Sequence, residues 1–322
     1  INLGAVNNWH LQTKGSGLTK YSRQGDGRAV LRSSIREFIM SEAMHALGIP
    51  TTRALALIGS SHKVYRSYEE VETGAVVMRM SPSWIRIGTF EFFARTKSPK
   101  KDLTPLADYV IKQSYAHLEN EEYKYEKMFY SLVDNTAQLI AKWQAYGFMH
   151  GVMNTDNMSM SGLTIDYGPY AFMDIFEKHN ICNHTDEHGR YSYNNQPHIA
   201  GWNLEVLANA LKDICDFEKL ISYLETFIPQ HIKIYLDLMN KRLGLDESLS
   251  GNSNLDLVLE LLGVLESSKC DYNCFFYELT KLENLDELTL VTNICISKEP
   301  MLKWFEEYKK VIKEQNQDFK TM

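Results

Sequence analysis

The spacing of hydrophobic and polar residues predicts that the first third of the chain combines several strands with one helix. Residues 9–14 alternate large and polar side chains before a Gly-Ser-Gly break, so we predict a short strand that ends at Lys14. Residues 53–57 and 74–80 are rich in Ala, Leu and Val, with turn-forming residues between them. This pattern predicts two further strands of one small sheet.

The helix of this region is predicted over residues 35–47. Ser34 stands three residues before Glu37, which is the spacing of a capping box, and apolar side chains follow at helical spacing. Gly48 and Pro50 then supply stop signals. The predicted helix therefore carries Glu37 in its first turn.

The remaining two thirds of the chain are predicted to be mainly helical. The polar segment 96–102 contains a proline and is typical of a connection between lobes, so we place a boundary near residue 94. Residues 148–200 are richer in Gly, Asn, His and Pro and predict loops, where functional residues gather. Helical apolar spacing is found over residues 103–117, 122–147, 202–213, 217–240 and 255–314. We predict an α+β fold with a small sheet-bearing lobe at 1–94 and a larger helical lobe, with catalytic and metal-binding loops, at 95–322.

Composition places the chain among ordinary globular proteins. It has 322 residues, of which 44% are hydrophobic and 23% charged. The net charge of −7 and the pI near 5.8 give no electrostatic reason to expect nucleic acid or an anionic membrane as a partner. No apolar run approaches the length that spans a bilayer. Any site for an anion must therefore be local.

The cysteines and the first residues bear on compartment and on the extent of the chain. Five cysteines, an odd number without a paired framework, predict a reducing compartment in which structural disulfides are not required. This is the cytoplasm, or the mitochondrial interior in a eukaryote. The start, Ile1-Asn2-Leu3-Gly4, resembles neither a signal peptide nor an ordinary initiator. We expect the chain to begin inside a longer protein.

A lysine and a glutamate give the first indication of chemistry. Lys14 ends a predicted strand, and Glu37 follows 23 residues later on the predicted helix. This order matches a protein-kinase-like bilobal fold, where such an ion pair holds the lysine against ATP phosphates. A surface lysine and a capping glutamate would give the same two residues, so the pair needs support from elsewhere.

That support comes from the loop region. His150-Gly-Val-Met-Asn-Thr-Asp-Asn157 is followed nine residues later by Asp166-Tyr-Gly168. In kinases, a loop asparagine and a following Asp-Phe-Gly aspartate hold the magnesium ions that neutralise the phosphates. Asn157 and Asp166 supply both groups, although turn chemistry is the alternative for an Asn-rich loop.

The usual catalytic aspartate is missing from this loop. Kinases place it four or five residues before the metal-binding asparagine, where this chain has Met153 and Val152. Asp156 is the carboxylate available, and it could accept a proton from an attacking hydroxyl or hold a second metal through water. We favour Asp156 as the base.

A local excess of positive charge lies at the start of the chain. Gly25-Asp26-Gly27 allows close backbone approach to phosphates, and Arg79 and Arg86 add forked donors from the later strand region. Solvation of a surface explains most basic runs, but together with the metal loop this one favours triphosphate binding. The cations of residues 1–36 are Lys14, Lys20, Arg23, Arg28, Arg32 and Arg36, against Asp26 alone.

Longer stretches of the sequence resemble the selenoprotein O family. They are Lys14-Gly-Ser-Gly-Leu-Thr-Lys to Glu37, Leu47-Gly-Ile-Pro-Thr-Thr-Arg-Ala-Leu55, and His150 to Pro169, together with Ile181-Cys-Asn-His184 and Asn195-Gln-Pro197. They cover most of residues 9–215 in order, and the later helices resemble the family more loosely.

The resemblance implies a pseudokinase fold that binds ATP in a flipped orientation and transfers AMP to Ser, Thr or Tyr hydroxyls of proteins. It implies that Glu37 positions Lys14, that Asn157 and Asp166 bind magnesium, with manganese as an alternative, and that Asp156 is the proton acceptor. The residues that it implies for nucleotide contact are Lys14, Asp26, Gly27, Arg79, Arg86 and Asp166.

Other interpretations stay open at this point. The chain could be a true kinase of proteins or small molecules, because only the base is displaced, or an ATP-binding scaffold without activity. Cys182, His184 and His188 have the chemistry of metal ligands but no established spacing. Cys270 and Cys274, one helical turn apart, predict a buried helix face.

Overall fold

The first part of the chain forms an antiparallel sheet around one central strand. We describe a computed structural model of the chain over residues 1–20, 22, 25–66, 71–246 and 252–315. Arg23, part of the basic run, lies outside these residues. The strands of the sheet are β1 (Asn2–Val6), β2 (Trp9–Lys14), β3 (Ala29–Val30), β4 (Arg53–Tyr65) and β5 (Val71–Ser81).

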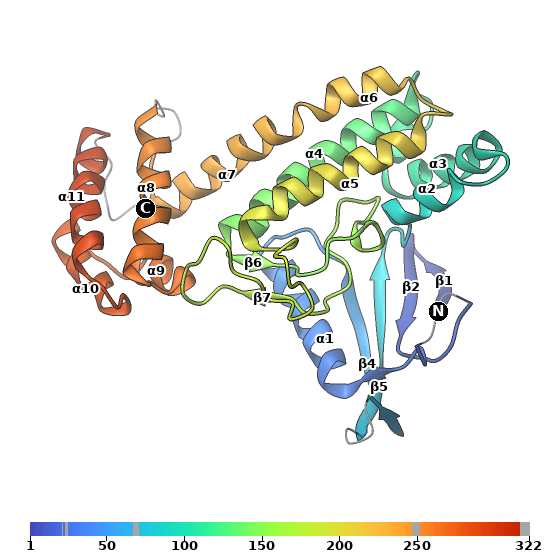
Figure 1. Cartoon of the computed structure of the whole chain (residues 1–322), viewed down its shortest axis with the longest axis horizontal. Helices are drawn as coiled ribbons and strands as arrows, with labels where there is room; N and C mark the ends of the chain where they lie inside the picture. Colours follow the sequence, from blue (N-terminus) through green and yellow to red (C-terminus); the bar gives the residue numbers. More distant parts are fainter. Residues whose placement is uncertain (21, 23–24, 67–70, 247–251, 316–322) are drawn as a thin grey trace. The chain divides into compact units, whose positions relative to one another are not determined.

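Strand β5 is the centre of this sheet and pairs with β2, β3 and β4 (Figure 1). All pairings are antiparallel, and the register of β2 on β5 places Gln12 opposite Arg79 and Lys14 opposite Val77. The predicted strands 9–14, 53–57 and 74–80 are thus confirmed, the last two within longer strands. This register brings the lysine and arginine candidates onto neighbouring strands.

Helix α1 (Leu31–Ala46) packs against β4 and β5 (Figure 1). The predicted helix is confirmed, but its capping box is wrong. The helix follows β3 directly, its N-cap is Val30 without a side-chain cap, and Ser34 is buried inside the first turns. The predicted stop is confirmed, since Leu47 is the C-cap and Gly48 adopts φ +71°.

The rest of the described chain is mainly helical. The predicted helix 217–240 is two helices, and the predicted connection 96–102 is partly helical because Pro99 occupies the first helical position. The helices are α2 (Ile87–Phe93), α3 (Pro99–Ser114), α4 (Lys124–Ala145), α5 (Gln196–Leu211), α6 (Phe217–Leu224), α7 (Phe227–Leu243), α8 (Asn252–Ser268), α9 (Tyr272–Leu279), α10 (Leu288–Val291) and α11 (Glu299–Glu314).

Residues 148–200 consist largely of loops, as predicted. Their regular elements are short: strands β6 (Phe148–Met149) and β7 (Ala171–Phe172), which pair with each other, and the 3₁₀ turns η2 (Thr155–Asn157) and η3 (Tyr193–Asn195), ahead of the start of α5. The two loop motifs of the sequence therefore lie outside long helices and strands.

The chain divides into two compact units. Unit 1 contains residues 1–139, 152–169 and 200–227, and unit 2 contains residues 140–151, 170–199 and 228–322. The predicted boundary near residue 94, between 1–94 and 95–322, falls inside unit 1 and stays a prediction. All the candidate site residues lie in unit 1.

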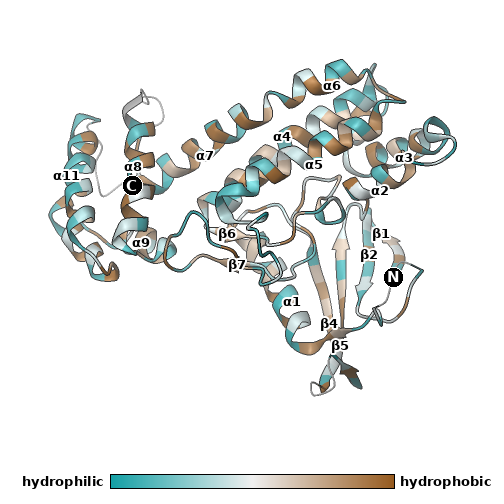
Figure 2. Ribbon diagram, in the orientation of Figure 1, coloured by the Kyte–Doolittle hydropathy of each residue, from teal (hydrophilic) through white to brown (hydrophobic). Residues whose placement is uncertain are grey.

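Unit 2 has its own core, in which aromatic side chains of α9 and α11 are fully or nearly fully buried. Hydrophilic and hydrophobic residues alternate along its helices (Figure 2), so each helix offers an apolar face to this core. Phe275, Trp304, Phe305 and Tyr308 are all within its core.

A disulfide closes part of this core. Cys270 and Cys295 are bonded, and their backbones also form an isolated antiparallel bridge. The odd cysteine count predicted no such framework, because two residues 25 positions apart meet only through the fold. Cys270 is buried as predicted, but Cys274 is exposed, so the prediction of one buried face for both is wrong.

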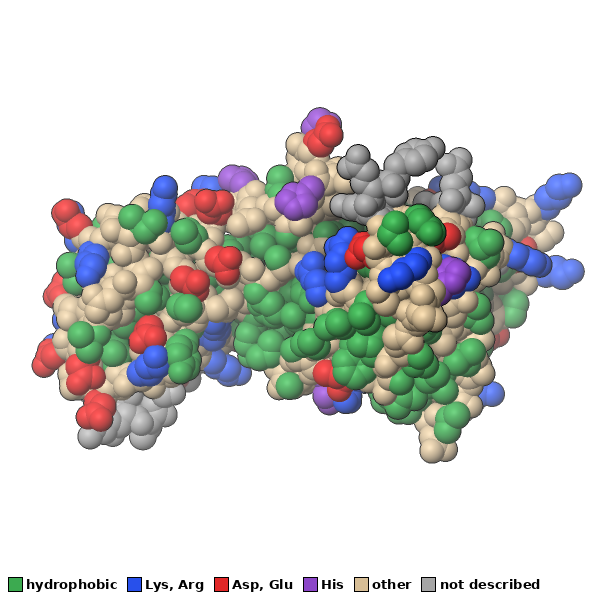
Figure 3. All heavy atoms as spheres, turned by 90° about the horizontal axis from the view of Figure 1, so that it is seen from below, with side chains coloured by type: hydrophobic (Ala, Val, Ile, Leu, Met, Phe, Trp, Pro, Cys, Tyr) green, Lys and Arg blue, Asp and Glu red, His purple; other side chains and the backbone are tan. Residues whose placement is uncertain are grey.

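One face of the described surface carries side chains of mixed character. In the face drawn in Figure 3, acidic and basic side chains are interspersed, with hydrophobic side chains gathered in places. Exposed apolar residues on α1 and β4 include Ile35, Ile39, Leu55 and Ile58. Of the helices that the structure describes, none has both the length and the apolar character to cross a membrane.

Candidate functional site

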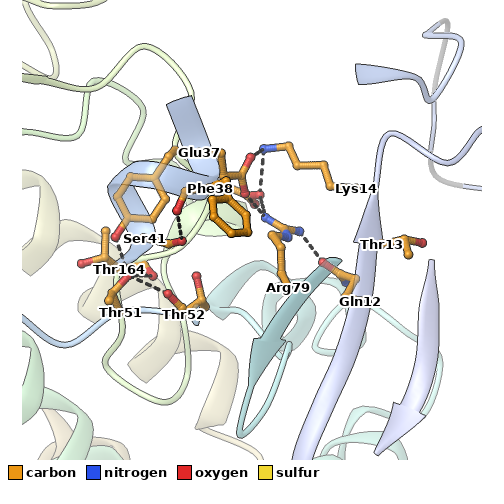
Figure 4. A network of polar contacts seen from close by, with 12 residues as sticks. Gln12, Thr13, Lys14, Glu37, Phe38, Ser41, Thr51, Thr52, Arg79 and Thr164 are labelled. Atoms are coloured by element: carbon orange, nitrogen blue, oxygen red, sulfur yellow. Dashed lines mark hydrogen bonds and ion pairs between the residues drawn. The ribbon is translucent and has the colours of Figure 1, made fainter. Parts of the chain in front are cut away.

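Lys14 and Glu37 meet as predicted. Lys14 ends β2, and its amine lies 2.7 Å from a carboxylate oxygen of Glu37 on α1 (Figure 4). The Glu37 side chain is almost fully buried, whereas that of Lys14 is about one-third exposed. A buried carboxylate without a partner would be costly, so the pair holds the lysine at the mouth of the site.

Arg79 joins the same carboxylate from the central strand. Its Nη1 donates to Glu37 at 2.8 Å and to Asp166, and its Nη2 donates to Gln12 (Figure 4). Burial of the guanidinium would lower the pKa of Arg79, but the charges of Asp166 and Glu37 outweigh this and raise it. Arg79 is therefore a fixed positive charge inside unit 1.

Gln12 was not identified from the sequence. It lies two residues before Lys14 on the same strand, and alternate residues of a strand share one face. That alternation was the signal that could have found it.

Asp166 is the second carboxylate of the cluster. It accepts from Arg86 at 2.9 Å, from Lys14 at 3.3 Å, and from Arg79. Burial would raise the pKa of Asp166, but the charges of Arg79, Lys14 and Arg86 hold it well below the usual range. With Glu37, two carboxylates face three cations, so the cluster keeps one excess positive charge.

The backbone at Asp166 is in an unusual conformation. Its φ is +60°, which costs an L-residue about 1–3 kcal/mol and persists only where the surroundings impose it. A hydrogen bond of 2.9 Å from the backbone N–H of Gly168 to the carbonyl of Asp166 closes this tight turn. The carboxylate is thus directed by an enforced turn.

A short backbone pairing fixes the other loop motif. Ile87 N–H donates to the Met158 carbonyl at 2.9 Å, and Met160 N–H donates to the Ile85 carbonyl at 3.0 Å. Between them, Arg86 and Ser159 form an isolated antiparallel bridge. The residues just before this pairing, Asp156 and Asn157, are therefore held beside the start of α2.

Asp156 and Asn157 lie on the 3₁₀ turn η2. The Asn157 amide donates to the Val152 carbonyl at 3.0 Å, which leaves its side-chain oxygen as an acceptor. Asp156 lies against Gly88, where an added Cβ would be 2.4 Å from a carboxylate oxygen. Gly88, which the sequence did not single out, makes room for that carboxylate.

A polar pocket of about 220 Å³ lies beside the cationic cluster within unit 1. Gly27 has φ +68°, and a Cβ there would stand 2.1 Å from the Gly17 carbonyl oxygen, so only glycine fits this crossing of two loops. The residues that line the pocket include Gln12, Lys14, Gly15, Gly27, Arg79 and Asp166. Such a pocket, with glycine backbone and cations around it, is of a kind that receives phosphates.

Not every predicted nucleotide residue is in this pocket. The Asp26 carboxylate accepts from the backbone N–H of Arg28 at 2.9 Å and lies 3.6 Å from the Arg66 guanidinium. Its contacts are therefore with these two residues and not with the cationic cluster. Neither Asp26 nor Arg86 is among the residues that line the pocket, although Arg86 contacts Asp166, which is. The role of Asp26 in nucleotide contact stays a prediction.

Two donors of the cluster are unsatisfied within the described part of the chain. The Nε atoms of Arg79 and Arg86 are buried without a hydrogen-bond partner among the described residues. Buried donors of this kind are uncommon in native proteins. Phosphate oxygens would satisfy them, so these residues fit a nucleotide.

The donor set also fits a hard divalent cation. Asn157 and Asp166 offer an amide oxygen and a carboxylate, which magnesium and manganese prefer to nitrogen or sulfur. Within the parts of the chain that the structure describes, no three His, Cys, Asp or Glu side chains are grouped to hold a metal. The alternative of a site made by Cys182, His184 and His188 is therefore wrong.

The geometry of the site is that of a class of protein. Proteins that bind nucleotide phosphates typically combine a strand lysine held by a helix glutamate with further cations and a glycine-walled pocket. This site has the lysine and glutamate, two arginines that contact one aspartate, and such a pocket. The chain matches the family described as "Protein adenylyltransferase SelO" over residues 2–322. It belongs to that family.

Curated relatives agree with the family match. The chain is 46% identical over 314 residues to "Protein nucleotidyltransferase YdiU" of Pseudomonas aeruginosa strain LESB58, covering 98% of this chain and 64% of the relative. It is 51% identical over 275 residues to the protein of that name from Pseudomonas putida strain W619, covering 85% of this chain and 56% of the relative. The chain thus spans less than two thirds of the length of these relatives.

Proposed function

We propose that this chain is the nucleotide-binding part of a protein adenylyltransferase with a kinase-like bilobal fold, which transfers AMP from ATP to Ser, Thr or Tyr hydroxyls of proteins. The observation that carries the proposal is the convergence of Lys14, Arg79 and Arg86 on Asp166 beside a pocket of about 220 Å³. The family and the names of the relatives support nucleotidyl transfer.

The residues of the cluster take separate roles in this proposal. Lys14, Arg79 and Arg86 bind the phosphates, and Glu37 positions Lys14 through the 2.7 Å pair. Asp166 and Asn157 hold magnesium or manganese. Such an ion, when held there, would supply charge neutralisation to the phosphates.

The transfer itself requires one bond to form and one to break. The acceptor hydroxyl oxygen attacks the α-phosphorus, and the bond from that phosphorus to the bridging oxygen breaks, so pyrophosphate leaves. The hydroxyl proton passes to Asp156, which Gly88 allows to lie beside the start of α2. In a flipped orientation of ATP, the arginines hold the γ-phosphate and leave the α-phosphate at the acceptor.

A true kinase is the second candidate, because the Lys14–Glu37 pair, Asn157 and Asp166 are the parts that phosphoryl transfer also uses. The position of the base favours adenylyl transfer. Where kinases carry their catalytic aspartate, this chain has Val152 and Met153, and Met153 is fully buried.

The test is the mass of the product. The protein is incubated with magnesium, ATP and a protein acceptor, and intact-mass spectrometry measures whether the acceptor gains a whole AMP or a single phosphate. We expect AMP, and expect Asp156→Asn to bind ATP as the wild type does but to transfer little. Addition of phosphate would establish the kinase instead, and binding without any transfer would leave an ATP-binding scaffold.

A further inference from the structure

We propose that Thr51 and Tyr167 are positioning residues, whose hydroxyl contact sets the place of Asp166 and thereby the affinity of the site for its metal ion; this rests on the proposed function. The two hydroxyls hydrogen-bond to each other, and both residues are buried (Figure 4 shows the Thr51 side of this contact). Neither side chain lines the phosphate pocket. Their effect must pass through Asp166.

Asp166 is anchored on both sides to the same short segment, residues 50–52. Two residues before it, Thr164 N–H donates to the Pro50 carbonyl at 2.9 Å, and Thr52 N–H donates to the Thr164 carbonyl at 3.0 Å. One residue after it, the Tyr167 hydroxyl bonds to Thr51. The enforced positive φ of Asp166 thus lies between two attachments to one anchor.

The anchor segment is itself fixed between α1 and β4. Glu42 of α1 accepts from the Arg53 guanidinium at 2.7 and 2.8 Å and from the Ala54 N–H at 3.0 Å. The same helix carries Glu37, which holds Lys14 and Arg79. Residues 50–52 therefore transmit the position of α1 to Asp166, and the carboxylate keeps its place relative to the cations.

The hydroxyl contact is the side-chain part of this connection. Thr51 Oγ1 has one proton, which it can donate to the Thr52 carbonyl at 3.0 Å or the Thr164 carbonyl at 3.4 Å, so the Tyr167 hydroxyl then donates to Thr51. Removing either hydroxyl leaves the backbone hydrogen bonds of Thr164 intact. The residue after Asp166, Tyr167, would then no longer be bonded to Thr51. Asp166 would then leave the geometry that a metal ligand needs.

The experiment compares Thr51→Val and Tyr167→Phe with the wild type, and measures by calorimetry how ATP binding depends on Mn²⁺ concentration. Each variant should need roughly tenfold more Mn²⁺ for half-maximal ATP binding, the size of one coupled hydrogen bond. The double variant should be no worse than Thr51→Val, because that substitution already removes the contact between the two hydroxyls. Thr51→Ser should restore the wild-type dependence.

Thr52→Val is the matched control, since Thr52 is also buried and its side chain is not part of the contact with Tyr167. It should leave the Mn²⁺ dependence unchanged. If Thr51→Val and Tyr167→Phe lower only the melting temperature and keep the wild-type Mn²⁺ dependence, the contact is structural and the proposal is overturned.

The outcome is separable from that of the proposed function. A wild-type protein with metal-dependent ATP binding but no AMP transfer would overturn the proposed function and leave the positioning role open to the same measurement. AMP transfer by the wild type, with an unchanged Mn²⁺ dependence in both variants, would overturn the positioning role alone. A wild type whose ATP binding ignores Mn²⁺ overturns it too.

Discussion

Arg79 and Arg86 both contact Asp166 but differ in what else depends on them. Arg79 is 5% exposed and also donates hydrogen bonds to Glu37 and Gln12. Its removal would therefore take one cationic partner from the buried Glu37 carboxylate. Losing one partner of a buried pair costs about 3–5 kcal/mol of folding free energy. Arg86, whose side chain is 26% exposed, can be removed with less damage to the fold. Arg86 is therefore the better probe of nucleotide binding.

Arg86→Ala should weaken ATP binding far more than ADP binding. If the arginine holds a γ-phosphate in a flipped nucleotide, its loss removes a charge-assisted contact of about 1.5–3 kcal/mol, which is roughly tenfold or more in affinity. ADP lacks that phosphate and should hardly respond. Calorimetry with both nucleotides in magnesium measures the difference.

Arg95→Ala is the control for this comparison. Arg95 is an exposed arginine on the same stretch of chain, paired with Glu91 rather than with Asp166. Both nucleotides should bind to the Arg95→Ala variant with the affinity that they have for the wild type. Equal losses of ATP and ADP in Arg86→Ala would mean that this arginine touches the inner phosphates, and the flipped orientation would lose its basis.

Among individual residues, the sequence identified the charged side chains of the site but not the residues that position them. Lys14, Glu37 and Asp166 were predicted because their order along the chain matches the order of the ATP-binding residues in kinases. The structure brings the three side chains together. Thr51 was not predicted, because a threonine in a connection has no distinctive pattern. Its role depends on Tyr167, which lies 116 residues away in the sequence.

Among the elements, the start of α2 and the turn η2 are in close contact. Gly88→Ala would place a methyl group 2.4 Å from the Asp156 carboxylate oxygen. Because that atom is the end of a side chain, Asp156 can move aside, so we expect little loss of stability but a loss of AMP transfer of tenfold or more, by analogy with small displacements of catalytic groups. Thermal melting and the rate of transfer measure the two effects.

Gly59→Ala on β4 is the matched substitution, because an added Cβ there meets nothing within 4 Å. It should change neither transfer nor melting by much. Wild-type transfer in Gly88→Ala would show that Asp156 need not stay in its place, and the base would have to be sought elsewhere.

Elements were predicted well where hydrophobic spacing is long and less well at their ends. α1 begins four residues before the predicted helix, since β3 leads straight into it and no side-chain cap marks its start. The segment 217–240 keeps helical spacing across the break between α6 and α7. There Thr226 bonds the Tyr223 carbonyl at 2.7 Å, a local contact that periodicity cannot reveal.

For the whole molecule, the two units should differ in their response to reduction. The bond between Cys270 and Cys295 closes a loop of 25 residues in unit 2, which by loop entropy stabilises the unit by about 3–4 kcal/mol. Cys295→Ser should therefore lower the urea midpoint of an unfolding transition assigned to unit 2. ATP binding, which we propose for the site in unit 1, should persist at the same urea concentration.

Cys274→Ser tests whether loss of any cysteine matters, because Cys274 is an exposed free thiol of the same region. It should unfold as the wild type does. A single transition that shifts as a whole in Cys295→Ser would show that the two units unfold together.

The discontinuity of unit 1 determines when its site can form during synthesis. Arg79 precedes Asp166 by 87 residues, which a ribosome adds in about 4–17 s. Throughout that interval the nascent chain already contains Arg79 and Glu37 but lacks the second carboxylate. Unit 1 is complete only once residues 200–227 have emerged. A chain released before residue 166 would thus carry the cations of the cluster with Glu37 as their sole acidic partner within it.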